Sequence, residues 1–237
     1  MMSQSVYVWQ RAWNAEVREA VSRRASLFAG VVALDTEIGW KDGRSEHVEV
    51  AWDAESLRAA GVPVGLALRV GPCGKATMRD PATVAMLVEH AGRVVGMARQ
   101  RGIEPAELQV DFDCATSRLD DYAAWIRAIA SAVKPLPVTI TVLPTWMGSS
   151  SFGPLVRASA GFVLQVHSVD KARMEDERPS LCDDIQARRW IEDAARFGVP
   201  FQVALPSYGY LAVLDERGAL SGLVAESPVE LQADAAR

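Results

Sequence analysis

Short apolar runs alternate with longer segments of helical periodicity along most of the chain. The apolar runs are rich in Val, Ile and Leu and end at glycine, proline or polar residues, which is typical of buried strands. The expected strands are 6–9, 28–34, 63–70, 108–113, 137–143, 162–166 and 201–205. The expected helices are 14–24, 54–60, 81–101, 120–133, 150–159 and 182–197. This alternation predicts a parallel sheet that is covered by helices on the outside.

The seven expected strands, six of them followed by a helix, favour a (β/α)8 TIM-type barrel, either complete or incomplete, built as one domain over residues 1–237. Residues 211–224 have the pattern of a hairpin. Either Leu220 to Ala225 closes the barrel as an eighth strand, or the barrel lacks it and 219–237 is irregular or truncated. A doubly wound open sheet is the alternative architecture, although no GxGxxG turn follows the first strand.

Composition narrows the function classes. The chain is 49% hydrophobic and 23% charged, which is typical of a folded domain. Its net charge of −5 argues against nucleic-acid binding, for which a basic surface would be expected. The three cysteines are widely spaced, so neither a disulfide framework nor a zinc ribbon is expected. No apolar run reaches the ~18 residues of a membrane span. The sequence as it stands predicts a cytoplasmic protein, or a periplasmic or secreted one if a leader has been removed. We expect no cofactor, and the oligomeric state stays open.

Polar and aromatic residues follow the expected strands, at the ends that form the active-site face of a parallel barrel. Asp111 and Asp113 are two residues apart, which places both carboxylates on one side of a strand, pointing into the barrel mouth. Neighbouring carboxylates repel, so the pKa of one rises and the pair can divide into a proton donor and a charge stabiliser. Alternatively, Asp111 hydrogen-bonds to adjacent strands and Asp113 simply begins a loop.

Glu37, after the second apolar run, is a further candidate carboxylate that faces this pair, or else a solvated loop acid. Arg69 either binds an anionic substrate or, as we favour, pairs with an inward acid, because an unpaired inward charge is costly. Aromatic rings stack on the C–H faces of sugars, although any one tryptophan can instead pack in the core. The expected substrate-binding residues are Trp9, Gln10, Trp40, Arg69, Trp146, Gln165, His167 and Tyr208.

The segments VYVWQRAW, LQVDFDCATSRLDDY, TVLPTWM, FVLQVHS and VALPSYGY resemble an uncharacterised bacterial family, a domain of unknown function related to TIM-barrel glycoside hydrolases. The resemblance covers about residues 5–215. It implies a (β/α)8-type barrel that acts on or binds a polysaccharide. There is also a more distant similarity to chitinase-like barrels, whose fourth strand ends in D-x-D-x-E. Asp111 and Asp113 match the two aspartates, but Ala115 stands where the acid glutamate would be.

These observations predict a glycoside hydrolase-like protein that acts on a polysaccharide or oligosaccharide. In this hypothesis Asp113 is the general acid, Asp111 stabilises positive charge at the anomeric carbon, and Glu37 is the reserve base or nucleophile. A non-catalytic carbohydrate-binding barrel is one alternative, favoured by Ala115 and by the missing eighth unit. The other is a metal-dependent hydrolase with a site at Asp111, Asp113 and His167, although no HxH or HExxH spacing supports a metal.

Overall fold

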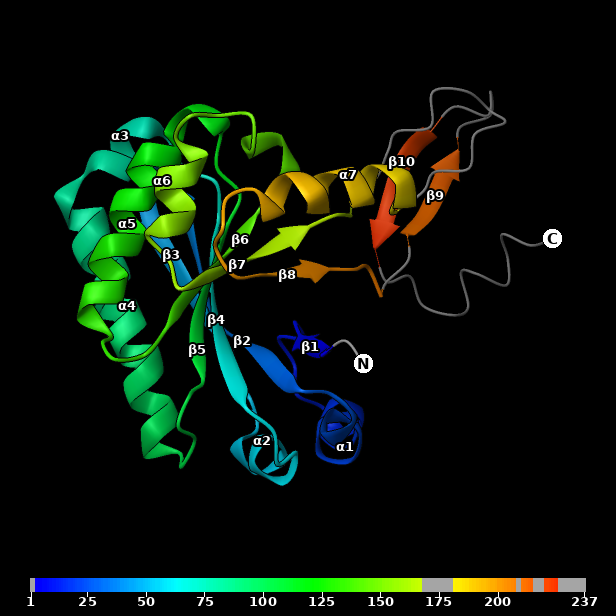
Figure 1. Cartoon of the computed structure of the whole chain (residues 1–237). Coiled ribbons are helices and arrows are strands. Elements are labelled where there is room, and N and C mark those ends of the chain that lie inside the picture. Colours follow the sequence, from blue (N-terminus) through cyan, green and yellow to red (C-terminus); the bar gives the residue numbers. More distant parts are fainter. Residues whose placement is uncertain (1–2, 168–180, 208–209, 215–219, 226–237) are drawn as a thin grey trace.

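The computed structural model describes residues 3–167, 181–207, 210–214 and 220–225, and its strands and helices alternate as expected (Figure 1). The strands are β1 Ser5–Val8, β2 Gly30–Lys41, β3 Arg44–Glu49, β4 Val64–Val70, β5 Glu107–Phe112, β6 Val138–Val142, β7 Gly161–Gln165, β8 Phe201–Ala204, β9 Tyr210–Leu214 and β10 Leu220–Ala225. The helices are α1 Ala15–Arg24, α2 Ala54–Ala59, α3 Lys75–Arg79, α4 Pro81–Gln100, α5 Leu119–Ala132, α6 Phe152–Arg157 and α7 Asp184–Ala195. None of these helices is long and apolar enough to cross a membrane.

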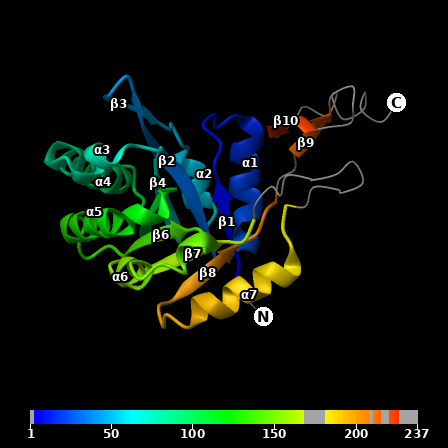
Figure 2. The ribbon, with the colours of Figure 1, turned by 90° about the horizontal axis from the view of Figure 1, so that it is seen from above.

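The main sheet follows the chain order. Its parallel strands lie side by side as β1-β2-β4-β5-β6-β7-β8. A doubly wound sheet reverses its strand order at a switch point, so the alternative architecture is wrong. Seen from above, the helices lie outside the curled strands (Figure 2). The fold is therefore TIM-like, with its strands curled into a partial barrel whose edges, among the described strands, are β1 and β8.

The strand at Leu220–Ala225 does not close this barrel. It is β10, which pairs antiparallel with β9 in a separate two-stranded sheet. This pairing confirms the predicted hairpin and contradicts the alternative in which the same residues form an eighth barrel strand. The remainder of the C-terminal segment predicted to be irregular, residue 219 and residues 226–237, lies outside the described residues.

The second strand is longer than the apolar run that predicted it. It continues to Lys41, turns at Asp42 and Gly43, and returns as β3 in antiparallel register. Asp42 has a φ of 51° and Gly43 a φ of 76°, and positive φ at both central residues is typical of a two-residue hairpin turn. Glu37 and Trp40 therefore lie on a regular strand rather than in a loop.

We expect Gly43→Ala to lower the free energy of unfolding by about 1 kcal/mol, because a Cβ atom disfavours its left-handed backbone. Nothing lies within 4 Å of a Cβ at this position, so the loss is conformational. Gly39→Ala is the matched control, since Gly39 has equal space and no positive φ. Urea unfolding of both variants measures the difference, and equal losses would contradict the turn assignment.

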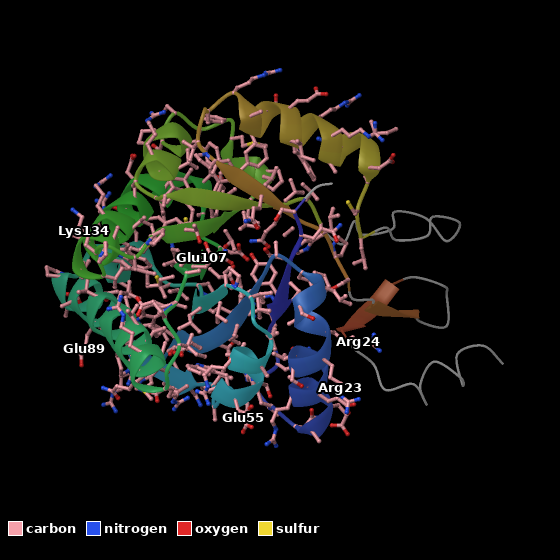
Figure 3. All side chains as sticks on the ribbon, turned by 60° about the horizontal axis from the view of Figure 1, so that its bottom comes forward. Arg23, Arg24, Glu55, Glu89, Glu107 and Lys134 are labelled. Carbon is pink, nitrogen blue, oxygen red and sulfur yellow. The ribbon has the colours of Figure 1, made fainter. Side chains whose placement is uncertain are left out.

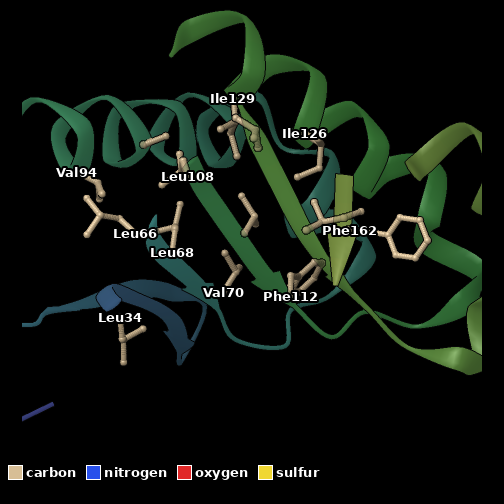
Figure 4. Close-up of a cluster of buried hydrophobic side chains, with 14 of the residues drawn as sticks. Leu34, Leu66, Leu68, Val70, Val94, Leu108, Phe112, Ile126, Ile129 and Phe162 are labelled. Atoms are coloured by element: carbon tan, nitrogen blue, oxygen red, sulfur yellow. The ribbon is translucent and has the colours of Figure 1, made fainter. Parts of the chain in front are cut away.

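The hydrophobic core lies between the strands and the outer helices (Figure 4). Strand residues with outward side chains alternate with inward ones. The outward strand residues include Leu66, Leu68, Val70, Leu108 and Phe112, and they pack with Val94 of α4 and with Ile126 and Ile129 of α5. These side chains are almost fully buried, so they fix which face of each strand points into the barrel.

The inward face of the barrel carries hydrogen-bonded polar side chains among apolar ones such as Val32 and Leu34. Figure 3 shows Glu107 among the strands, whereas Arg23, Glu55 and Glu89 lie at the outer edge. Thr139 Oγ1 donates to Glu107 Oε2 at 2.7 Å, and a Cβ on Gly65 would come within 2.9 Å of the Glu107 side chain. Hydrogen-bonding side chains therefore line the barrel interior below the carboxyl ends of the strands.

Candidate functional site

A row of three charged side chains crosses the mouth of the barrel. Glu37 on β2 pairs in register with Arg69 on β4, which in turn pairs with Asp111 on β5. Arg69 Nη1 lies 3.9 Å from Glu37 Oε1, and Arg69 Nε lies 3.6 Å from Asp111 Oδ2. The structure thus brings the two carboxylates to either side of one guanidinium group, and confirms that Arg69 pairs with inward acids.

Asp111 and Asp113 point to the same side because Phe112 is anchored on the other side. The Phe112 ring is 1% exposed and stacks on Trp125, with 5.0 Å between ring centroids. Asp111 is held from the neighbouring strand, where Thr141 Oγ1 donates to its Oδ1 at 2.6 Å. Both side chains consequently lie on the inward side, as the spacing predicted. Asp111 also bonds to the adjacent strands and Asp113 begins the loop after β5, as the alternative interpretation expected.

Asp113 occupies the rim, just after β5 ends. Gln165 Nε2 donates to its Oδ1 at the long distance of 3.5 Å. Asp113 as a whole is exposed, but neighbouring groups shield part of its carboxyl group from water. This partial desolvation raises the pKa of Asp113, as does the charge of Asp111, whereas Arg69 and Gln165 lower it. A carboxyl group with a raised pKa keeps its proton to higher pH, which suits a proton donor.

His167 follows β7 and is half-buried. Burial lowers the pKa of His167, and the charge of Asp111 offsets only part of this effect. A histidine with a lowered pKa stays neutral at neutral pH, so it can both donate and accept hydrogen bonds. Gln165, two residues earlier, lies on the inward face of the same strand.

The predicted aromatic residues divide between the mouth and the strand extension. Trp9 lies half-buried at the end of β1 and stacks on Tyr7, with ring centroids 5.2 Å apart and an interplanar angle of 14°. Gln10, the next residue, is exposed. Trp40 is half-buried on the extension of β2, and both rings pack partly against the core. Because Trp9 directly follows β1 at the mouth, we take it as the first tryptophan to test as a sugar platform.

Trp146 follows β6, but its ring is not open to the mouth. Its side chain is 1% exposed, its Nε1 donates to the backbone oxygen of Cys114 at 3.1 Å, and its ring meets that of Tyr122 edge-on. A ring buried in this way packs in the core, so we leave Trp146 out of the proposed site. Tyr208 lies outside the described residues.

Sequence reasoning missed Arg11, which forms an ion pair with Glu37 through its Nε. The only signal was a basic residue in the first loop after a strand. It also missed Tyr7 and Thr141, although period-two alternation along their strands places them on the inward face. Tyr7 Oη donates to Gln109 Oε1 at 2.7 Å beneath the carboxylates.

No group of three His, Cys, Asp or Glu side chains within the described ranges is arranged to hold a metal ion. Asp111 is instead engaged by Thr141 and Arg69, and Asp113 by Gln165. The arrangement therefore gives the metal-dependent alternative no specific support.

We expect Cys114 to react with iodoacetamide at pH 8 about 100-fold or more slowly in the folded protein than in urea, because only the thiolate is nucleophilic. Burial raises the pKa of the Cys114 thiol to about 12. Mass spectrometry of the alkylated peptides measures the rate, and the half-buried Cys73 serves as an internal comparison. Equal rates in the folded and unfolded protein would contradict the burial of this thiol.

Comparisons with known proteins agree with this architecture. A family model described as "Domain of unknown function (DUF3142)" matches residues 74–237. No curated protein matches the sequence. Similar solved structures include the spore cortex-lytic enzyme SleL of Bacillus megaterium (TM-score 0.68, 14% identity, 99% of this chain and 56% of that one). A chitinase from Bacteroides thetaiotaomicron matches with a TM-score of 0.67 and 12% identity, over 88% of this chain and 69% of that one. A mutant GH18 chitinase of Cycas revoluta in complex with (GlcNAc)4 matches with a TM-score of 0.63 and 14% identity, over 99% of this chain and 80% of that one.

The chain spans just over half the length of SleL. Identities this low show the fold alone, which is a TIM-like barrel similar to that of the GH18 chitinase.

Proposed function

The chain belongs to the DUF3142 family of unknown function, and we propose from its site that it is a glycoside hydrolase-like protein acting on a polysaccharide or oligosaccharide. One observation carries the proposal. At the carboxyl ends of the barrel strands, Asp113 with its raised pKa lies two residues from Asp111, which Thr141 and Arg69 hold. Two carboxyl groups in unlike environments can act as proton donor and charge stabiliser.

In the proposed reaction Asp113 gives its proton to the glycosidic oxygen as the bond between that oxygen and the anomeric carbon breaks. The bonding electrons leave with the oxygen, and the Asp111 carboxylate stabilises the positive charge on the anomeric carbon. Water then adds to that carbon and returns a proton to Asp113. Glu37 is the reserve base or nucleophile, next to Asp111 across Arg69.

Substrate binding is proposed for the side chains around this pair. The Trp9 ring supplies an apolar face, and Gln10, Gln165 and His167 offer hydrogen bonds. Trp40 lies farther along the extension of β2, where it would meet a longer substrate. The names of the similar structures include chitinases and a complex with (GlcNAc)4, which supports N-acetylglucosamine polymers as the first substrates to test.

The test is to incubate the protein with (GlcNAc)4 and with a panel of bacterial exopolysaccharides while new reducing ends are measured. The proposal predicts product above that of an Asp113→Asn sample treated identically. No product with any substrate, together with saturable binding in calorimetry, would replace it with the second candidate.

That second candidate is a carbohydrate-binding barrel without catalysis, and the residue that favours it is Ala115. Ala115 is exposed two residues after Asp113, where chitinase-like barrels carry a glutamate. The variant Ala115→Glu separates the candidates, since turnover that appears only in this variant would show that the natural chain binds without a competent acid.

A further inference from the structure

We propose that Arg69 makes this site selective for sugars that bear a carboxylate. The inference rests on the proposed carbohydrate site and names the class of its ligand. It starts from the row of Glu37, Arg69 and Asp111, in which the cation stands between two acids.

The cation is the exposed member of this row. The Arg69 side chain is 55% exposed, whereas those of Glu37 and Asp111 are each 15% exposed. Arg11, which pairs with Glu37 from the loop after β1, is 68% exposed. A ligand that enters the mouth beside this row therefore meets guanidinium groups before it meets either carboxylate.

Arg69 also has donors to offer. Its contacts with Glu37 and Asp111, at 3.9 and 3.6 Å, are longer than hydrogen bonds. Within the described residues none of its N–H groups donates a hydrogen bond, although a guanidinium group carries five N–H donors in a planar fork. This fork matches both oxygens of a carboxylate, which forms a bidentate pair with shorter and stronger bonds.

The local charge permits an anionic ligand. The carboxylates of Glu37 and Asp111 are balanced by the guanidinium groups of Arg69 and Arg11. Asp113 lies at the rim beside this row, and the charge of Arg69 acts on it as well. An incoming carboxylate thus meets a row in which Glu37 and Asp111 are balanced by guanidinium groups and the cations are outermost.

The test compares two ligands that differ only in charge. They are a hyaluronan tetrasaccharide, which alternates N-acetylglucosamine with glucuronic acid, and the same tetrasaccharide with its carboxyl groups methylated. Calorimetry on the whole chain is expected to show about tenfold tighter binding of the acid form at low salt. This preference should shrink as salt is added.

Variants assign the preference to one residue. Arg69→Gln is expected to bring the affinity ratio of acid to ester close to one, and Arg69→Lys, which keeps the charge but loses the fork, to lower it partly. Arg99→Gln is the matched control, since Arg99 lies in the last turn of α4, pairs with Glu104 and carries the same charge. This control should keep the wild-type ratio of acid to ester affinity.

Thermal unfolding shows whether each variant is folded. If Arg69→Gln does not fold, the affinity ratio of Arg69→Lys, measured over the same salt series, tests the role of Arg69 instead.

Equal binding of the two forms by the wild-type chain, binding of neither, or an unchanged ratio in Arg69→Gln would overturn the inference. Turnover measured in parallel separates this failure from that of the proposed function. Cleavage of (GlcNAc)4 without a preference for the acid form refutes the role of Arg69 alone. A preference for the acid form without cleavage of any substrate refutes hydrolysis and supports the role of Arg69.

Discussion

Replacing Asp113 with asparagine is expected to lower turnover by about 10²–10⁴-fold, because the amide has no proton to give to the leaving oxygen. Substrate affinity should change little, since asparagine keeps the shape and hydrogen-bonding capacity of the side chain. In the wild type, turnover should fall as the pH rises through the pKa of Asp113, which desolvation and Asp111 hold above its ordinary value. Initial rates across pH for both proteins measure this.

The matched control for this loss is Asp193→Asn, which makes the same change on α7, where Asp193 pairs with Arg196. It should retain wild-type rates across the same pH range. Full activity of Asp113→Asn, or an alkaline decline that persists in a partly active Asp113→Asn, would remove Asp113 from the mechanism.

Truncating Trp146 to alanine is expected to lower the free energy of unfolding by about 3–5 kcal/mol. The ring is buried against Tyr122, and its Nε1 bond to Cys114 would be lost as well. Trp9→Ala should have the opposite profile, with weaker carbohydrate binding and a smaller loss of stability, because Trp9 is only half-buried at the mouth. Urea unfolding and calorimetry with (GlcNAc)4 measure the two effects.

Trp146→Phe is the conservative companion, because it retains most of the buried area and loses only the hydrogen bond and some volume. It should be less destabilised than Trp146→Ala and bind carbohydrate normally. A Trp146→Ala protein that unfolds like the wild type but no longer binds sugar would place this ring in the site after all.

The local signals of the sequence located most helices and strands. Asn14, where the first expected helix begins, caps α1 by accepting from the backbone N–H of Val17. Gly61, Gly102 and Gly198 follow helices and adopt φ values of 65°, 74° and 66°, which explains why glycine marks these ends. Such signals depend on neighbouring residues only, so a single sequence contains them.

The β2–β3 hairpin was missed for a different reason. The Asp42–Gly43 signal is present in the sequence, but β3 is exposed along its whole length and has no apolar run to mark it. The strand was overlooked because hydrophobic periodicity guided the prediction. The signal of the turn itself was sufficient to find it.

The composition of the site depends on contacts that spacing cannot fix. Period two placed Asp111 and Asp113 together, yet nothing local indicates that Arg11 reaches Glu37 across 26 positions. Trp146 follows a strand just as Trp9 does, but its ring is buried and meets that of Tyr122 on α5 edge-on. Spacing thus placed the two aspartates on one side of a strand, but it could not show that the Trp146 ring is buried.

The most direct measurement of the central claim is the amide chemical shift map of the isotope-labelled chain during titration with (GlcNAc)4. We predict saturable shifts that concentrate at the carboxyl ends of the barrel strands, around Trp9, Arg69, Asp111, Asp113 and Gln165. Shifts confined to the outer helices or to the opposite end of the strands, or no shifts at saturating sugar, would contradict a carbohydrate site at this face.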